Sequence, residues 1–234
     1  MLLFVDNGKN AGYNVGNKVL IKRWMFLLRC SYYDVSELSQ QEIFVSAMKE
    51  LVWKQRAEKA ERYRFDKDKR LCLGAGLLAQ DMLKKAGAAD LRLGYSQFGK
   101  PYLLTHSDIH FNLSHDGQIA VCAVSDEAVG VDVQQLTVYD PKVAGRVFTD
   151  DEIGLIEGAD DRDAAFTQMW ARKESLIKLY GTGFLKDAKE FSVPQGEGRS
   201  YFFSELLLEE YYICVCSEKY QEAEFSGWAW SERE

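Results

Sequence analysis

The sequence lacks any apolar run that approaches the roughly 20 residues of a membrane-spanning helix. Its N-terminal region carries basic residues, but the apolar stretch that follows them, Met25–Leu28, is too short for the core of a signal peptide. No small-residue cleavage site comes after this stretch. We therefore expect a cytoplasmic protein that has no membrane partner.

Cysteine pairs and zinc-ligand spacings are also missing. The five cysteines are odd in number and scattered, so they do not form a disulfide framework. Cys214 and Cys216 point the same way from a predicted strand, yet no second pair completes a zinc site. The histidines, His106, His110 and His115, have no partner spacing for zinc either. We expect reduced thiols.

The chain lacks the positive charge expected of a general nucleic-acid binder. Its 29 Lys and Arg residues are outnumbered by 36 Asp and Glu residues, which gives a formal net charge of −7. The charge is uneven, because residues 49–70 are rich in Lys and Arg whereas residues 196–234 are rich in acids. A local positive field of this kind steers anionic ligands even when the total charge is negative. We expect no nucleic-acid partner.

What is present is the composition of an ordinary globular protein, with 47% hydrophobic, 13% aromatic and 28% charged residues. A length of 234 residues suits either one large unit or two halves. Residues 1–24 show no regular period over most of their length and are interpreted as an N-terminal extension. We divide the remainder into an N-terminal half, residues 25–127, and a C-terminal half, residues 128–234.

A capping-box signature at Ser39 and Glu42 opens a predicted amphipathic helix. Its helical spacing of apolar residues is followed by later turns that bring a row of basic residues to the polar side. These basic residues are Lys54, Arg56, Lys59 and Arg62. A second helix is predicted over residues 66–85, and Gly87 follows it as a stop signal.

The second helix contains the segment Gly74–Ala79, which has the formal pattern of a dinucleotide-binding loop. That fingerprint requires a strand and a tight turn before its first glycine, whereas the preceding segment here is charged and helical. We therefore interpret the small residues as sites of close helix packing. A Rossmann-type oxidoreductase ranks well behind other functions.

From residue 91 the hydrophobic period changes to two, which predicts strands. The runs LRLGY, PYLL, HFNLS, QIAVCAVS and VGVDVQ are separated by turn-like segments and predict an antiparallel meander. Thr149 and Glu152 then repeat the capping-box signal, a long helix is predicted over residues 162–180 with Gly181 and Gly183 closing it, and strands return. Helices followed by a small antiparallel sheet thus occur twice, which predicts an α+β fold of two similar halves.

The strand VGVDVQ carries the first candidate site. Because side chains alternate along a strand, the valines face one side while Asp132 and Gln134 lie together on the other. Two oxygen donors on one face suit a hard cation such as Mg²⁺, whose shell substrate phosphates and water complete. The alternative is a solvated strand face without function.

The segment WARKESLIKLYGTG carries the second candidate site. Trp170, Glu174 and Lys178 are four residues apart and share one face of the predicted helix. Lys173 interrupts the apolar stripe of this helix, and a charge there indicates an anionic site held against the core. The alternative is an exposed Glu–Lys pair worth a few tenths of a kcal/mol.

Ser114 and His115 are neighbours on a predicted strand, so their side chains point to opposite faces. This geometry disfavours a hydrolase in which His115 takes a proton from Ser114. Hydrogen bonds from either residue to a phosphate are a milder use, and a structural role is the alternative. Lys100 lies in the turn FGKP, where a surface turn residue is the simple interpretation.

Taken in order, the motifs GKPYL, FNLSHDG, VGVDVQ and WARKESLIKLYGTG resemble those of the Sfp-type 4′-phosphopantetheinyl transferases. Each motif alone is weak, but four in the same order are specific, and they cover residues 56–183 with the flanking basic residues. The resemblance implies two similar halves related by a pseudo-twofold axis, with coenzyme A between them. It implies transfer of phosphopantetheine from coenzyme A to a serine of an acyl or peptidyl carrier protein, releasing adenosine 3′,5′-bisphosphate.

The resemblance also assigns roles to residues. Asp132 and Glu174 are implied to ligate Mg²⁺ on the pyrophosphate, and Glu174 is also the candidate general base for the carrier serine. Lys178 is implied to contact the pyrophosphate. The remaining residues implied to bind coenzyme A are Ser114 or His115 at its phosphates, Lys100 at the nucleotide, and Arg56, Lys59 and Arg70 at the 3′-phosphate. Such residue types suffice, because phosphoryl transfer needs charge neutralisation and alignment more than covalent catalysis.

One position departs from the usual pattern of this family, which has a second acid where this chain has Gln134. An amide donates a carbonyl oxygen without charge, so we expect weaker Mg²⁺ binding with activity retained. A non-catalytic coenzyme A-binding or scaffold protein is the main alternative, and the presence of Asp132, Glu174 and Lys178 argues against it. The carrier contact is predicted at Lys142, Arg146, Val147 and Phe148, and the chain is expected to be a monomer.

Overall fold

The computed structural model describes residues 28–182, 188–193 and 200–231, together with three short strands nearer the N-terminus. These strands are β1 (Phe4–Asp6), β2 (Asn10–Val15) and β3 (Lys18–Leu20), and they pair in the antiparallel order β1-β2-β3. Short strands therefore occur in residues 1–24, although the sequence shows no regular period over most of that stretch. Their role as an extension stays a prediction.

The rest of the described chain repeats one topology. In each copy a strand and, after three α-helices, two later strands form an antiparallel sheet in the order first, third, second. The first copy has an additional two-stranded hairpin between its last helix and these two strands. The first copy contains β4 (Arg29–Asp34), α1 (Gln41–Glu50), α2 (Lys54–Arg62), α3 (Asp66–Lys85), β7 (His110–Asp116) and β8 (Ile119–Ser125). The second copy contains β9 (Val129–Gln135), α4 (Pro141–Val147), α5 (Asp150–Glu157), α6 (Arg162–Tyr180), β10 (Phe202–Leu208) and β11 (Tyr211–Ser217). The predicted α+β fold of two similar halves is confirmed.

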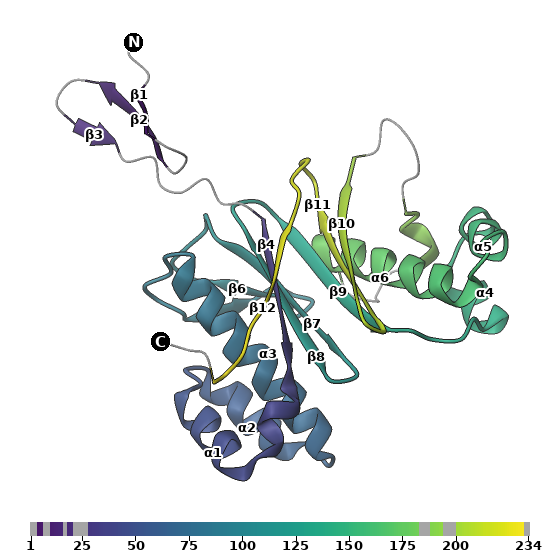
Figure 1. Ribbon diagram of the computed structural model, residues 1–234, viewed down its shortest axis with the longest axis horizontal. Coiled ribbons are helices and arrows are strands. Elements are labelled where there is room, and N and C mark those ends of the chain that lie inside the picture. Colours follow the sequence, from purple (N-terminus) through teal and green to yellow (C-terminus); the bar gives the residue numbers. More distant parts are fainter. Residues whose placement is uncertain are drawn as a thin grey trace.

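The two sheets share one apolar layer, and the helices lie outside it (Figure 1). Val131 and Val133 of β9 pack in the same buried cluster as Val121 and Ala123 of β8. The helix α3 covers the other face of the first sheet, and α6 covers β9 and β11 of the second. Strands buried on both faces have near-continuous apolar sequences, which explains the run in β8.

Strands β7 and β9 lie side by side at the seam between the sheets, joined by side chains. Asn112 Oδ1 accepts a hydrogen bond from the Val131 N–H at 3.0 Å, and Asp116 Oδ2 accepts one from the Gln135 N–H at 2.8 Å. Ser114, between these two β7 residues, also faces β9 because side chains alternate along a strand. Side-chain oxygens thus satisfy backbone donors of β9 that a neighbouring strand would otherwise satisfy.

The C-terminal segment returns to the first half. Its strand β12 (Glu224–Gly227) pairs in parallel with β4, which extends the first sheet to the order β12-β4-β8-β7. Beyond it, Trp228 donates through Nε1 to Asp81 Oδ2 at 2.9 Å, and its ring packs edge-on against Tyr33. The division between residues 127 and 128 stays a proposal. Residues 224–230 follow that division in the chain but pack on the first half.

The predicted meander was wrong at both of its ends. Strands β5 (Leu93–Tyr95) and β6 (Pro101–Leu103) form a separate antiparallel hairpin, while β7 pairs with β8. The next strand, β9, pairs with β11 rather than with β8. The apolar residues of β9 are compatible with pairing to either β8 or β11. Because β11 lies far along the chain, the local sequence does not reveal that it is the partner.

The predicted first helix is also interrupted, because tertiary contacts hold residues 51–53 outside helical geometry. The Val52 N–H donates to Gln80 Oε1 at 2.8 Å, and Trp53 Nε1 donates to the Leu91 carbonyl at 2.6 Å. The capping box expected at Ser39 does not form, since Ser39 ends a short 3₁₀ helix (Val35–Ser39) and Gln40 precedes α1 without a side-chain cap.

Other local predictions are confirmed. The helices over 66–85 and 162–180 have the predicted bounds, and Thr149 and Glu152 form the capping box of α5. Gly181 ends α6 in the left-handed conformation with φ 67°, while Gly183 lies outside the described residues. Small residues of α3 pack closely as expected, since Gly74 faces Tyr33 and Val35. No described helix is both long and apolar enough to cross a membrane.

The closest helix–strand approach occurs where α6 crosses β9 at Gly130. A Cβ atom there would overlap the Ser175 carbonyl oxygen and lie 2.5 Å from the Leu179 backbone nitrogen. We expect Gly130→Ala to lower the free energy of unfolding by about 3 kcal/mol, because backbone atoms cannot rotate away from the added methyl group. Denaturant unfolding followed by circular dichroism measures this change.

Gly154→Ala is the matched control for this substitution. Gly154 lies inside α5, and a Cβ atom there would meet nothing within 4 Å. The same chemical change should raise the free energy of unfolding by ~0.5–1 kcal/mol, since alanine favours the helix over glycine. Equal effects of the two substitutions would contradict the role assigned to Gly130.

Candidate functional site

The approach of α6 to β9 brings polar residues from three segments together. Gly130 and Asp132 lie on the same face of β9, and the missing side chain of Gly130 admits the α6 backbone. One turn apart on α6, Glu174 and Lys178 therefore lie beside Asp132. Ser114 reaches the same point from β7 across the seam.

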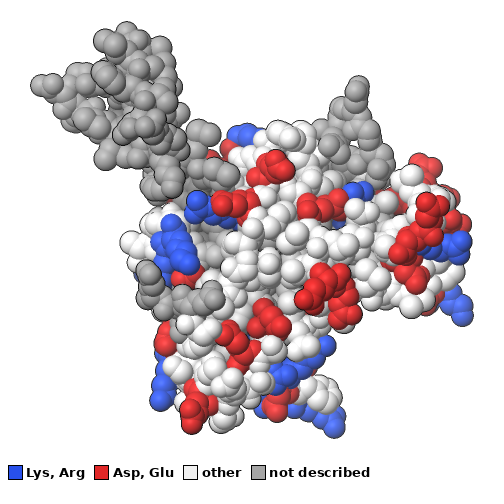
Figure 2. All heavy atoms as spheres, in the orientation of Figure 1, with Lys and Arg blue, Asp and Glu red and all other residues white. Residues whose placement is uncertain are grey.

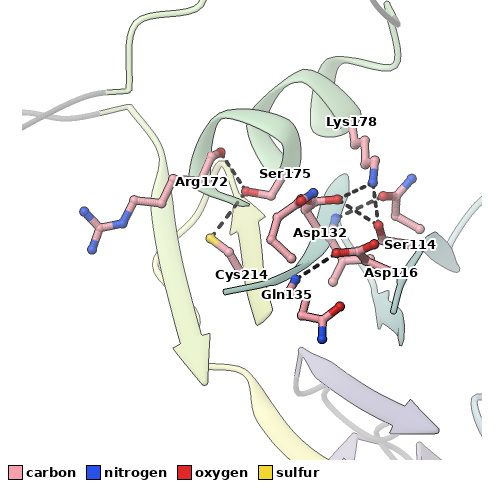
Figure 3. Close-up of polar contacts among 11 residues, drawn as sticks. Ser114, Asp116, Asp132, Gln135, Arg172, Ser175, Lys178 and Cys214 are labelled. Carbon is pink, nitrogen blue, oxygen red and sulfur yellow. Dashed lines mark hydrogen bonds and ion pairs between the residues drawn. The ribbon is translucent and has the colours of Figure 1, made fainter. Parts of the chain in front are cut away.

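Asp132 is the centre of the hydrogen bonds in this group (Figure 3). Its Oδ1 accepts from Ser114 Oγ at 2.7 Å and from Lys178 Nζ at 2.5 Å, and its Oδ2 accepts from Gln134 Nε2 at 2.7 Å. Lys178 also donates to Ser114 Oγ at 2.7 Å. The Asp132 side chain is only 2% exposed, so the carboxylate is buried and paired rather than solvated.

Glu174 has a different environment from Asp132. It is half-buried, and its carboxylate has no hydrogen-bond partner among the residues that the structure describes. Burial and the nearby negative charge of Asp132 raise the pKa of Glu174 to about 7, although Lys178 opposes the shift. Two carboxylates thus share one ammonium group, and a further cation would stabilise both in their charged form.

The donor set fits Mg²⁺ if phosphates and water complete the coordination shell and if two side chains change position. Two carboxylates and an amide are hard oxygen ligands, and Mg²⁺ usually takes only one or two protein carboxylates and completes its shell with phosphates and water. Within the described part of the chain no cluster of three or more His, Cys, Asp or Glu side chains could hold a metal without such help. Ligation by Asp132 and Gln134 would require Lys178 to move and the Gln134 amide to turn its oxygen inward.

The basic residues predicted to bind coenzyme A differ in their burial and in their distance from the Asp132 group. Partial burial of the imidazole and the positive charges of Arg56 and Lys178 lower the pKa of His115, so a neutral imidazole lies near these two cations. Arg56 is anchored, since its Nε donates to the Cys72 carbonyl at 2.8 Å. Lys59 is exposed on α2 and Arg70 half-buried on α3, and no hydrogen bond of the described structure joins either to Asp132.

Lys173 does not face the Asp132 group. Its side chain is 1% exposed, and its ammonium forms an ion pair with Glu152 Oε2 at 2.6 Å and donates to the carbonyls of Val147 and Ala188 at 3.2 and 3.3 Å. An ammonium has three hydrogens, and the described residues supply an acceptor for each of them. The anion held against the core is thus a carboxylate of the protein, which corrects the inference that Lys173 marks a ligand site.

Lys100 is likewise bonded to protein atoms, here the backbone carbonyls of Val129, Lys178 and Leu179. Its aliphatic chain lines a cavity of about 150 Å³ beside the end of α6. Aromatic rings of Tyr102 and Tyr180 line the same cavity. The structure therefore brings Asp132, Gln134, Glu174, Lys178 and Ser114 together, with His115 and Arg56 adjacent, and places Lys100 at a neighbouring cavity.

Sequence reasoning missed the residues that hold this arrangement. Asn112 and Asp116 flank Ser114 at alternate positions of FNLSHD, and a row of three polar side chains on one strand face could have revealed the seam. Glu152 gave a different signal, the capping box, which concealed its second bond to Lys173.

Comparison with known proteins identifies the family of this chain. Residues 39–127 match a family model described as 4′-phosphopantetheinyl transferase, N-terminal, and residues 128–231 match that of the 4′-phosphopantetheinyl transferase superfamily. A 4′-phosphopantetheinyl transferase of Bacillus subtilis is 28% identical over 70% of this chain and 80% of its own length. The transferase psf-1 of Bacillus pumilus is 29% identical over 77% and 84%, and the transferase Sfp of Bacillus subtilis strain 168 is 28% identical over 59% and 64%, respectively. The two matched segments cover both halves of the fold, and the chain belongs to the 4′-phosphopantetheinyl transferases of the Sfp type.

Proposed function

We propose that this transferase uses Mg²⁺ to move the 4′-phosphopantetheine group of coenzyme A to a serine of an apo carrier protein, releasing adenosine 3′,5′-bisphosphate. The observation that carries the proposal is the buried group of Asp132, Lys178 and Ser114 with the carboxylate of Glu174 beside it, which bonds no other described residue. Because all its members come from one chain, we propose that the enzyme works as a monomer. We place it in the cytoplasm.

Coenzyme A has two charged regions, the pyrophosphate and the 3′-phosphate, and the site has positive charge for both. Lys178 and the hydroxyl of Ser114 would contact the pyrophosphate, since both lie at the seam beside Asp132. Arg56 and His115, with Lys59 and Arg70 farther along α2 and α3, would hold the 3′-phosphate. The cavity lined by Tyr102, Tyr180 and the stem of Lys100 suits the flat adenine ring.

The reaction forms one bond between the carrier serine oxygen and the phosphorus that bears the pantetheine arm, and breaks the bond from that phosphorus to the bisphosphate. Mg²⁺, held by Asp132, Gln134 and Glu174, would neutralise charge on the pyrophosphate. Lys178 would stabilise the negative charge that grows on the phosphate oxygens. Glu174 would take the serine proton, directly or through a water molecule, because its carboxylate lies beside Asp132 and Lys178 at the proposed pyrophosphate site.

The carrier contact is proposed on the segment after β9. Lys142 and Arg146 are exposed on α4 and suit an acidic carrier, and Val138 is 75% exposed just before them. Phe148 is fully buried in the core of the second half, so the earlier inclusion of Phe148 in this contact was wrong. Figure 2 shows basic and acidic side chains side by side over α4 and α5, so the proposed basic patch is small.

The first experiment incubates the protein with coenzyme A, Mg²⁺ and a panel of apo carrier proteins and records the intact mass of each carrier. We expect a gain of one phosphopantetheine group, abolished by EDTA and reduced ~10²- to 10⁴-fold by Glu174→Ala, which removes the proposed base. Glu224→Ala, at an exposed surface pair with Arg29, is the control and should leave the rate unchanged. Coenzyme A binding without transfer to any carrier would instead support a non-catalytic binding protein.

A second prediction concerns Gln134, whose amide faces Asp132. In Gln134→Glu a carboxylate replaces that donor, so we expect the Mg²⁺ concentration for half-maximal rate to fall about tenfold, or ~1.4 kcal/mol. Without metal the same variant should unfold more easily, because two carboxylates would oppose each other where a 2.7 Å hydrogen bond now forms. Mg²⁺ titration of the transfer rate and thermal unfolding in EDTA measure the two effects.

Gln135→Glu is the matched control, since Gln135 donates to the exposed Glu210 carboxylate at 2.8 Å and faces away from the site. It should leave the Mg²⁺ requirement unchanged. An unaltered Mg²⁺ requirement in Gln134→Glu itself would mean that residue 134 is not a metal ligand.

A third prediction tests the carrier surface. Arg146→Glu should raise the KM for an acidic carrier about tenfold, because it replaces attraction with repulsion at an exposed position. The affinity for coenzyme A, measured by calorimetry, should not change. Lys49→Glu makes the same charge reversal on α1 of the other half and should leave both quantities unaltered. A carrier KM that responds equally to both substitutions would place the contact elsewhere.

A further inference from the structure

Lys100 makes a connection between the halves that the motif resemblance does not imply. It lies in the turn between β5 and β6 of the first half, and its side chain reaches into the second half. Its Nζ donates to the backbone carbonyls of Val129 at 3.0 Å, Lys178 at 2.7 Å and Leu179 at 3.1 Å. These acceptors use the three hydrogens of the ammonium, so none is left for a phosphate of the substrate.

The turn that carries Lys100 is held in one conformation. Ser96 Oγ accepts hydrogen bonds from the backbone N–H groups of Phe98 and Lys100 at 3.3 and 3.1 Å. Gly99 takes the left-handed conformation with φ 83°, which few other residues adopt. A rigid turn of this kind directs the side chain of its next residue, so Lys100 is presented to the second half in a fixed direction.

The acceptors explain why an ammonium belongs at this point. The last carbonyls of a helix have no intrahelical partners, and the negative end of the helix dipole favours a cation. Lys178 and Leu179 supply two such carbonyls at the end of α6. No carboxylate in the described chain forms an ion pair with Lys100, and burial lowers the pKa of its ammonium to about 8. The terminal carbonyls of α6 therefore take the place of a counterion.

The bonded carbonyls belong to the two elements that build the site. Val129 is the first residue of β9, three positions before Asp132, and Lys178 carries the ammonium that bonds Asp132. We propose that Lys100 is a positioning residue that fixes the end of α6 against the start of β9. It thereby keeps the Lys178 and Asp132 side chains at bonding distance from each other. Only its effect on the rate rests on the proposed transferase reaction.

The test compares Lys100→Met with Lys54→Met. Both remove an ammonium that donates to a backbone carbonyl at a helix end, but Lys54 is exposed and bonds the Lys49 carbonyl at the end of α1 rather than α6. Three quantities are measured on the full chain: hydrogen exchange of the backbone amides in residues 176–182, the Kd for coenzyme A by calorimetry, and kcat at saturating coenzyme A and carrier.

For Lys100→Met we expect faster amide exchange in residues 176–182 and a fall in kcat of ~10- to 100-fold, because small misplacements of reacting groups are costly. The Kd for coenzyme A should stay within about threefold, since no bond to the ligand is lost. Lys54→Met should change none of the three. A tenfold or larger rise in Kd with kcat and exchange unchanged would overturn the proposal and make Lys100 a direct ligand of coenzyme A.

Lys100→Arg covers the case in which the methionine variant does not fold. A guanidinium keeps the charge but spreads its donors over a planar fork, which cannot meet three carbonyls that converge on one point. We expect a folded protein with coenzyme A affinity retained, kcat reduced, and exchange in residues 176–182 between those of wild type and an unprotected helix end. Unchanged exchange would refute the positioning role, whether or not a carrier substrate has been identified.

Discussion

The contact between β9 and α6 at Gly130 is the constraint on which the site depends. A strand repeats every two residues and a helix nearly every four, so fixing one point of contact fixes which side chains meet beyond it. Ser175 and Leu179 rest on Gly130, and Glu174 and Lys178 precede each of them by one residue. Asp132, two positions after Gly130, is then the β9 residue that Lys178 can reach.

Pairing with carboxylates explains why α6 can carry lysines in its buried surface. α6 is buried on most sides, and its two interior lysines each have their own carboxylate: Lys173 bonds Glu152, and Lys178 bonds Asp132. The first pair has further protein partners, because the Glu152 carboxylate also accepts hydrogen bonds from the backbone N–H groups of Thr149 and Val193. The second pair has Glu174 beside it with a raised pKa. An excess of negative charge at the second pair favours a further cation there, whereas the carboxylate of the first pair already has protein partners.

Local signals in the sequence were sufficient for α5 and α6 and for the alternation that places Asp132 and Gln134 on one face. They failed where the decisive partner is distant. The break after α1 depends on Gln80 and Leu91, and the pairing of β9 depends on β11. Lys173 shows the physical limit most clearly, since its position in an apolar stripe indicated an anion but could not identify Glu152 as that anion. The motif order compensated for this limit by bringing Ser114, Asp132 and Glu174 together before any distance was known.

The duplicated topology produces a seam, and the seam explains why the site lies between the halves. Each copy leaves an edge strand, β7 or β9, whose backbone needs partners. Asn112 and Asp116 supply them with side-chain oxygens, which places Ser114 between them, facing β9. Direct pairing of the two strands would have joined the sheets without these polar side chains. Because the seam is polar, one half can contribute Ser114 and the other Asp132 and Lys178, so the proposed site depends on the register between the two halves.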